Sequence, residues 1–284
     1  MYKNYSKMFK YIGIRGHRGA GKNTISYLLG FAINYFIKKN KSWQGFESAY
    51  EAQVKRILDE PSFIEDVMFS ESDLKNVFFE SFADNPKIMV TQLFGLPCDY
   101  AYNDWTKDAV IVNLSDFSYK LAKDKLDLHA NIEKFKPYKA EQLYEIVRND
   151  SNFLNNNDVY ITLRELISYF SKYVMQNAFG RSVWVKSLEV TNWETERFYS
   201  SEKTIYKILT DCKFPTEITY VKNNKGVIVK VNRFNNIKDN TNISEELEND
   251  TRFDYELNLD GNLLNPKLIE DIKCLTLEII SKND

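Results

Sequence analysis

The residues from Gly16 to Lys22 have the types and the spacing of a loop that binds phosphate groups. They spell G-x-x-x-x-G-K, in which glycines let backbone N–H groups turn toward an anion and the lysine adds a compact positive charge. A short apolar run, Tyr11 to Arg15, precedes the motif, and apolar residues at helical spacing follow it from Ile25 to Ile37. Strand, glycine-rich turn and helix are the context that this motif requires, because the helix N-terminus adds a dipole that favours phosphate.

This loop predicts an ATP site with a departure at the metal-binding position. We expect the nucleotide to contact Gly16, Arg18, Gly19, Ala20, Gly21, Lys22, Asn23 and Thr24. The Ser or Thr that normally follows the lysine and binds Mg²⁺ is replaced by Asn23, and Thr24 comes one place later. Either Asn23 or Thr24, directly or through a water, would help to hold the metal, or both are ordinary helix-capping residues.

A carboxylate follows a second apolar run. Thr204 to Leu209 alternates like a core strand and leads into Thr210 and Asp211. In enzymes with this kind of loop, such an Asp lies beside the phosphates and orients Mg²⁺ or its waters. Asp211 is therefore a third candidate metal-binding residue, and the alternative is an Asp in a surface turn.

The elements that would position these groups alternate between strand and helix along the chain. Further short β-rich runs are Val77–Phe82, Glu217–Val221, Gly226–Val231 and Tyr255–Leu259, and Asn265–Ile280 has the spacing of a closing helix. This order predicts an α/β fold with a mostly parallel sheet covered on both faces. Residues 105–160 are rich in Lys, Asp, Glu and Asn with apolar residues at helical spacing, so we expect a mainly helical insertion into a core formed by 1–104 and 161–284.

The composition limits the classes of function. The chain has 284 residues, 38 Lys and Arg against 40 Asp and Glu, and a net charge of -2, so it offers no broad field for nucleic acid or anionic lipid. Its three cysteines are far apart and form no CxxC pair, which fits a reducing compartment and argues against zinc. No apolar run is long enough for a signal peptide or a membrane span, so we expect a cytoplasmic protein without membrane or nucleic-acid partners.

Several blocks along the chain resemble the bacteriophage deoxynucleoside monophosphate kinases, a family of P-loop enzymes. GKNT at Gly21–Thr24 resembles the family's GKDT, and FADNPK at Phe82–Lys87 resembles its F-A-D-P-x-K. The later blocks that follow the family's order are TLREL at Thr162–Leu166, FGR and WVK at Phe179–Lys186, DCKFPTE at Asp211–Glu217, the strand from Gly226 to Val231, SE at Ser244–Glu245 and DYELNLDG at Asp254–Gly261. These blocks cover most of the chain except about 107–160.

The resemblance implies a P-loop three-layer sandwich of the nucleoside monophosphate kinase type. It implies ATP- and Mg²⁺-dependent phosphorylation of (deoxy)nucleoside monophosphates to diphosphates, and a place in the host cytoplasm if the protein is encoded by a phage. The residues that match the family's acceptor blocks are Asp84, Lys87, Arg164, Arg181, Trp184 and Glu217. Lys87 and Arg164 would hold the acceptor phosphate, with solvated surface cations as the alternative, and Trp184 would either face the base or fill the core.

In such a reaction the acceptor is already an anionic oxygen, so catalysis reduces to alignment and charge neutralisation. Lys22, Asp211, Lys213 and Arg233 are the candidate catalytic residues, and Arg233 would act from a mobile lid or be a plain surface residue. Two alternatives remain: a P-loop kinase of another small phosphorylated metabolite, and a non-catalytic P-loop nucleotide-binding protein. Formation of a homodimer stays open, and departures such as Ser171–Lys172 and Asn242 leave substrate preference less defined than reaction type.

Overall fold

The computed structural model describes residues 8–17, 19–60, 63–64, 74, 76–121, 138–149, 159–189, 204–233 and 251–281. The chain forms two compact units. The first consists of residues 1–82 and 188–284, and the second of residues 83–187.

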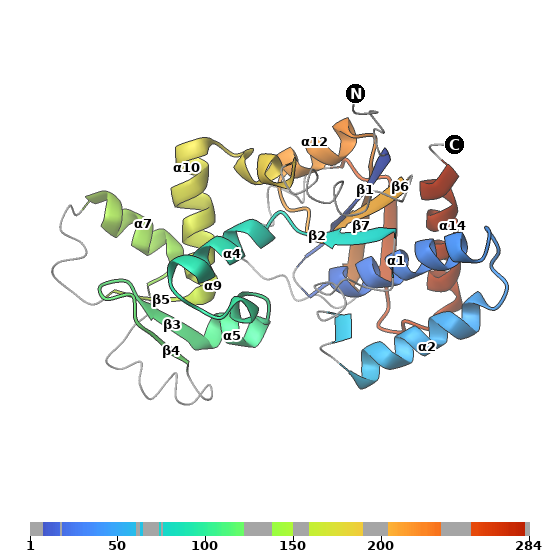
Figure 1. The fold of residues 1–284 in the computed structure, drawn as a ribbon, viewed down its shortest axis with the longest axis horizontal. Coiled ribbons are helices and arrows are strands. Elements are labelled where there is room, and N and C mark those ends of the chain that lie inside the picture. Colours follow the sequence, from blue (N-terminus) through green and yellow to red (C-terminus); the bar gives the residue numbers. More distant parts are fainter. Residues whose placement is uncertain are drawn as a thin grey trace, which may run out of the picture. The chain divides into compact units, whose positions relative to one another are not determined.

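The first unit is built on a five-stranded sheet in the order β2-β6-β1-β7-β8 (Figure 1). The strands are β1 (Met8–Arg15), β2 (Val77–Glu80), β6 (Thr204–Leu209), β7 (Val227–Arg233) and β8 (Tyr255–Leu259). Every neighbouring pair is parallel. The expected α/β fold with a parallel sheet is therefore confirmed.

Helices cover both faces of this sheet. Ile12 and Ile14 of β1 are fully buried in a core that includes residues of α1 (Lys22–Lys38), α2 (Phe46–Asp59) and α14 (Pro266–Ser281). Successive strand residues point to opposite faces, so Tyr11 faces the other side, where its ring lies 5.5 Å from Tyr220 of α12 (Pro215–Asn223). The layers are thus α12 on one face, the sheet, and the three longer helices on the other.

The prediction of a strand at Glu217–Val221 is wrong, because this segment is the middle of α12. Pro215 occupies the first turn, where a missing N–H is tolerated, and the Glu217 carboxylate accepts from the N–H of Phe214. Ile218 and Val221, three residues apart, are both fully buried, as on one face of a helix. The β-branched residues of this segment favour a strand when they are considered alone. Pro215 and Glu217 at the helix start and the three-residue spacing of the buried Ile218 and Val221 are instead typical of a helix.

The second unit contains a small antiparallel sheet in the order β4-β3-β5, formed by β4 (Tyr119–Leu121), β3 (Val110–Asn113) and β5 (Tyr160–Thr162). Its helices include α4 (Asp84–Leu93), α5 (Asp104–Ala109), α7 (Ala140–Asn149), α9 (Leu163–Tyr169) and α10 (Gln176–Phe179). A 3-10 turn, η1 (Cys98–Ala101), follows α4, and a π-helical segment, η2 (Phe170–Met175), joins α9 to α10. A separate core unites α4, β3, β5, α7 and α9 through residues such as Val90, Val112, Leu143, Ile161 and Leu163.

The segment expected to be a mainly helical insertion, 105–160, lies inside this second unit. Its described residues include strands β3 and β4 as well as helices α5 and α7, so it is not helical alone. The sequence did not predict strand β3, because Val110–Asn113 is only four residues long. So short a run does not show the two-residue period of a strand within the surrounding polar sequence.

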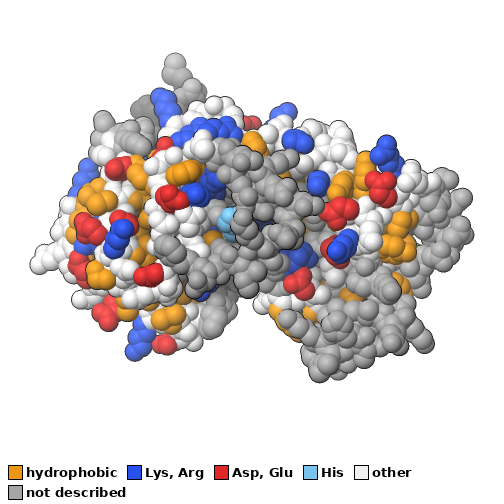
Figure 2. Space-filling model, turned by 180° about the vertical axis from the view of Figure 1, so that it is seen from behind, with side chains coloured by type: hydrophobic (Ala, Val, Ile, Leu, Met, Phe, Trp, Pro, Cys, Tyr) orange, Lys and Arg blue, Asp and Glu red, His pale blue; other side chains and the backbone are white. Residues whose placement is uncertain are grey.

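The described surface carries charges of both signs. On the face in Figure 2, Lys and Arg side chains are interspersed with Asp, Glu and hydrophobic ones. This mixture agrees with the small net charge of -2. None of the described helices is both long and apolar enough to cross a membrane.

Candidate functional site

The sheet of the first unit places the candidate residues at its topological switch point. From β1 the chain leads through α1 and α2 to β2, on one side of β1, and from β6 it leads through α12 to β7, on the other side. In open parallel sheets, the crevice for ligands lies at the carboxyl ends of two neighbouring strands whose connections diverge in this way. Here these strands are β1, which leads into Gly16, and β6, which leads into Asp211.

The loop after β1 depends on glycine at two positions. A Cβ on Gly16 would lie 2.4 Å from the carbonyl oxygen of Val231, so only glycine fits beside β7. Gly21 is the N-cap of α1 and has a left-handed backbone with φ of 86°, a conformation that disfavours other residues. Between them the Ala20 N–H donates to the His17 carbonyl oxygen at 3.1 Å and closes the turn.

The N-terminus of α1 has features that suit an anion. No side chain caps it, and its first turn contains no acidic residue. Neither Asn23 nor Thr24 therefore acts as the capping residue; Asn23 is exposed and Thr24 half-buried at the helix start. The N-terminal amides of this 17-residue helix suit a phosphate group, as does the open space around Gly19, where an added Cβ would meet no atom within 4 Å. Arg18 lies outside the described residues.

Charged groups from the two strand ends meet at this crevice. The Lys22 Nζ donates to the carbonyl oxygens of Gly16 and His17, each at 2.9 Å, and lies 3.7 Å from the Asp211 Oδ1. The Lys213 Nζ lies 2.5 Å from the Asp211 Oδ2. One carboxylate is thus held between two ammonium groups, at the carboxyl ends of β1 and β6.

Arg233 also reaches the loop. It is the last residue of β7, and its Nη1 donates to the Gly19 carbonyl oxygen at 3.4 Å. The expected set Lys22, Asp211, Lys213 and Arg233 therefore gathers around one loop, although these residues come from three strand ends.

Glu217 has a buried position beside this cluster. Its side chain is only 4% exposed, and its Oε2 accepts from the backbone N–H groups of Lys213 and Phe214 at 2.5 and 2.9 Å. Burial outweighs these hydrogen bonds and raises the pKa of Glu217 to about 8. The contacts indicate that Glu217 fixes the turn carrying Asp211 and Lys213.

The sequence reasoning missed a buried ion pair next to the site. Lys207, in the middle of β6, is fully buried, and its Nζ lies 2.9 Å from the Oε1 of Glu80, the last residue of β2. A lysine inside the apolar run TIYKIL and a glutamate closing VFFE were the available signals, because charges in central strands are retained only when paired. The pair fixes a carboxylate at the carboxyl edge, one strand away from Asp211.

In the second unit, Asp84 and Lys87 form one polar cluster. The Lys87 Nζ lies 3.2 Å from the Asp84 Oδ1 and 4.4 Å from the centre of the Tyr102 ring. Burial, with the nearby Asp84 carboxylate adding to it, raises the pKa of Tyr102 above its ordinary value. The ammonium is thus oriented by a carboxylate and an aromatic face.

Arg164 lies at the start of α9 and binds Asp108 through two hydrogen bonds, from its Nε at 2.5 Å and its Nη2 at 3.1 Å. Arg181 is exposed. Trp184 is 4% exposed, which supports the interpretation that it fills the core rather than faces a base. The expected acceptor residues other than Glu217 therefore share the second unit, in at least two separate clusters.

Among the described residues, no group of three or more His, Cys, Asp or Glu side chains could hold a metal ion by itself. Comparison with protein-family models and with curated proteins found no match to this chain. The candidate site therefore rests on its own residues and geometry.

Proposed function

We propose that this protein is a nucleotide-binding phosphotransferase that transfers the terminal phosphate of ATP to a (deoxy)nucleoside monophosphate. The observation that carries the proposal is the meeting of Lys22, from the loop after β1, with Asp211, from the end of β6, at 3.7 Å. A glycine-rich loop, an uncapped helix N-terminus and a paired lysine and aspartate suit the triphosphate of ATP with Mg²⁺.

The site residues have distinct parts in this proposal. Backbone amides at the start of α1 would bind phosphate oxygens, and Lys22 would exchange its two carbonyl acceptors for them. Mg²⁺ would be held by Asp211 together with Asn23 or Thr24, and it would neutralise charge on the transferred group. Lys213 and Arg233 add positive charge at the same loop, and no general base is required because the acceptor is a phosphate oxygen.

The acceptor class rests on the family resemblance and on two cations of the second unit. Lys87 and Arg164 are each oriented by a carboxylate, Asp84 and Asp108, which reduces the conformational freedom that each would lose on binding a phosphate. The family resemblance implies that the sequence blocks containing these two residues form the monophosphate pocket.

The test is a coupled assay with ATP and Mg²⁺ across the deoxy- and ribonucleoside monophosphates, for the native protein and for Lys22→Ala. We expect turnover with at least one monophosphate and a loss of about 10²-fold or more in kcat for the variant, because Lys22 stabilises developing charge. Lys55→Ala, an exposed lysine on α2, is the matched control and should retain full activity.

Each other outcome selects an alternative. Transfer to a different phosphorylated metabolite, with none to nucleoside monophosphates, would make the protein another kind of small-molecule kinase. ATP binding without transfer to any acceptor would make it a non-catalytic nucleotide-binding protein. Native-like turnover of Lys22→Ala with an unchanged melting temperature would remove the loop assignment itself.

A further inference from the structure

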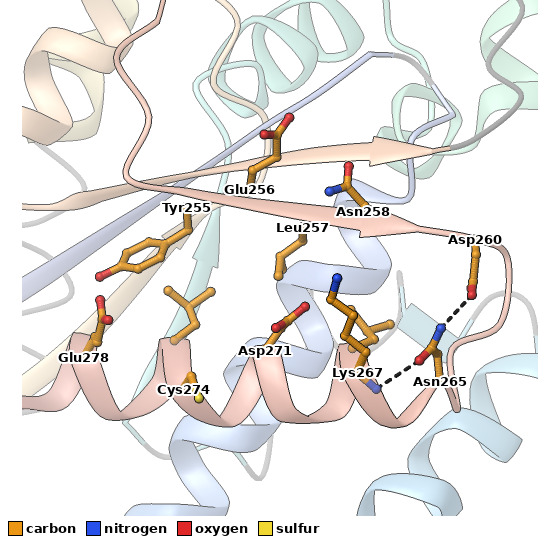
Figure 3. Close-up of a pocket in the computed structure, with 12 residues that line it drawn as sticks. Tyr255, Glu256, Leu257, Asn258, Asp260, Asn265, Lys267, Asp271, Cys274 and Glu278 are labelled. Carbon is orange, nitrogen blue, oxygen red and sulfur yellow. Dashed lines mark hydrogen bonds between the residues drawn. The ribbon is translucent and has the colours of Figure 1, made fainter.

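A groove runs along the outer edge of the first unit's sheet, between β8 and α14. It has a volume of about 500 Å³ and is lined by residues of these two elements and of the turn that joins them. Its floor includes the buried side chains of Leu257, Leu268 and Leu275. Figure 3 shows that Tyr255 and Leu257 point from β8 toward α14, whereas Glu256 and Asn258 point to the opposite side of the strand.

The strand that borders this groove lies at one end of the sheet, as far as the chain is described. Within the described part of the chain, β8 is the last strand of the sheet and pairs only with β7. Alternate backbone N–H and C=O groups of an edge strand point away from the sheet, so an added strand can form hydrogen bonds there. The edge and the groove together suit an extended segment.

Charges along the groove determine what kind of segment fits. Of the acidic lining residues, Glu256 points to the other side of β8 (Figure 3) and pairs with Lys230, which leaves Asp260, Asp271 and Glu278 against one basic lining residue, Lys267. On α14, Lys267, Asp271, Cys274 and Glu278 recur at positions i, i+4, i+7 and i+11, which places them in one stripe facing the strand. The apolar floor is therefore bordered by a negative wall.

We propose that this groove binds an extended, cationic peptide segment of a partner protein, which adds to β8 as a further strand. Backbone hydrogen bonds to the β8 edge would supply affinity, and alternate lysine or arginine side chains would meet Asp271 and Glu278 on α14. The proposal is independent of the phosphotransfer reaction, because none of these residues belongs to the loop or to its charged cluster.

Two other occupants fit the charges less well. Two copies of this chain joined edge to edge would bring the same acidic groove residues against each other. The chain's own segment 234–250 contains one lysine and five acidic residues, so its charge does not complement the groove. A basic segment from another protein has the required sign.

The test uses a fluorescein-labelled decapeptide of alternating lysine and valine with the full-length protein, measured by fluorescence anisotropy. Two control peptides separate the contributions: alternating glutamate and valine tests charge, and the lysine–valine peptide N-methylated at alternate amides keeps its charge but cannot donate the strand hydrogen bonds. We expect each control to bind at least about tenfold more weakly, and binding of the first peptide to fall with added salt.

Variants locate the binding site. Asp271→Lys with Glu278→Lys should weaken peptide binding at least about tenfold, whereas Glu51→Lys with Asp59→Lys, exposed acids on α2, should leave it unchanged. Bound peptide should also slow alkylation of the exposed Cys274 in the groove and not that of Cys98, which lies in the other unit. Equal binding of the N-methylated peptide, no effect of the groove variants, or unprotected Cys274 would each overturn the proposal.

Discussion

At the residue scale, the most consequential arrangement is that both proposed phosphate-binding cations of the second unit already have acidic partners. Lys87 pairs with Asp84, and Arg164 forms a two-bond contact with Asp108. Such partners hold long side chains in one orientation and reduce the conformational entropy lost when a ligand binds. An acceptor phosphate would then join or replace the carboxylate.

Replacing these cations should affect the acceptor and not ATP. Lys87→Ala and Arg164→Ala should each lower the acceptor's kcat/KM by about ten- to several hundred-fold, because a charge-assisted contact to phosphate contributes on the order of a few kcal/mol. Arg164→Lys should recover little, since a point charge cannot replace the planar fork. The measurement is steady-state kinetics with each substrate varied in turn, alongside direct ATP binding.

Lys139→Ala, an exposed lysine of the same unit, is the control for these variants and should behave like the native protein. Weaker ATP binding with unchanged dependence on the acceptor would place Lys87 and Arg164 on the wrong side of the reaction.

Glu217 predicts a pH dependence of stability. Its pKa is raised from 4.5 to about 8 in the folded protein, so between these values the unfolded chain releases a proton that the folded protein retains. The stability contribution of Glu217 is therefore fully present below about pH 4.5 and is lost as pH rises toward 8, by up to a few kcal/mol. Glu217→Gln removes the titration, so the native protein should lose stability relative to this variant over the same range.

Urea unfolding of both proteins at several pH values between 5 and 8 measures this difference. A stability difference that stays constant across the range would show that Glu217 is ionised in the folded protein, held by the N–H groups of Lys213 and Phe214.

At the element scale, long apolar runs and the loop motif were predictable from the sequence, and short or mixed segments were not. Thr204–Leu209 and Tyr255–Leu259 are strands over the expected residues. The first is an almost fully buried run, and the second alternates, with Leu257 and Leu259 buried between exposed polar residues. The strand predicted at Glu217–Val221 was wrong, because its β-branched residues belong to a helix that begins at Pro215. Lys207 and Glu80 were each visible as a charge in an apolar run, but the sequence could not show that they pair, because pairing across β2 and β6 depends on strand order.

The strand–loop–helix unit gives a prediction that separates two glycines. Gly16→Ala would place a methyl group 2.4 Å from the Val231 carbonyl oxygen, a backbone atom that cannot move without displacing β7. Gly19→Ala meets no atom within 4 Å and has only the strain of its φ of 76°. We expect a loss of about 3 kcal/mol or more in unfolding free energy for the first and about 1 kcal/mol for the second.

Urea denaturation of the two variants and the native protein measures these losses. Equal losses of unfolding free energy would mean that the close approach of Gly16 to β7 does not restrict which residue can occupy position 16.

At the scale of the whole molecule, the limits of the predicted insertion differ from those of the compact second unit. The expected limits were 105 and 160, whereas the compact second unit runs from 83 to 187. The additional residues belong to it because apolar side chains of α4 and α9, such as Val90, Leu163 and Leu166, pack in the same core as β3. Such packing joins segments about 70 residues apart in the chain, and a local pattern cannot reveal it.

The second unit should fold without the first, which is the last prediction. It has its own core, distinct from that of the large sheet, and its two ends lie together, since the Asn85 Nδ2 donates to the Ser187 Oγ at 2.7 Å. Chain segments with a separate core and neighbouring ends can fold alone. A fragment of residues 83–187 should therefore unfold in one cooperative transition, which circular dichroism during heating would measure.

Two variants of this fragment test the role of its core. Val112→Asp, which buries a carboxylate in this core, should abolish the transition, and Lys139→Ala should preserve it. If the native fragment has no transition while the full chain does, the core around β3 depends on the rest of the protein, and the two units fold as one.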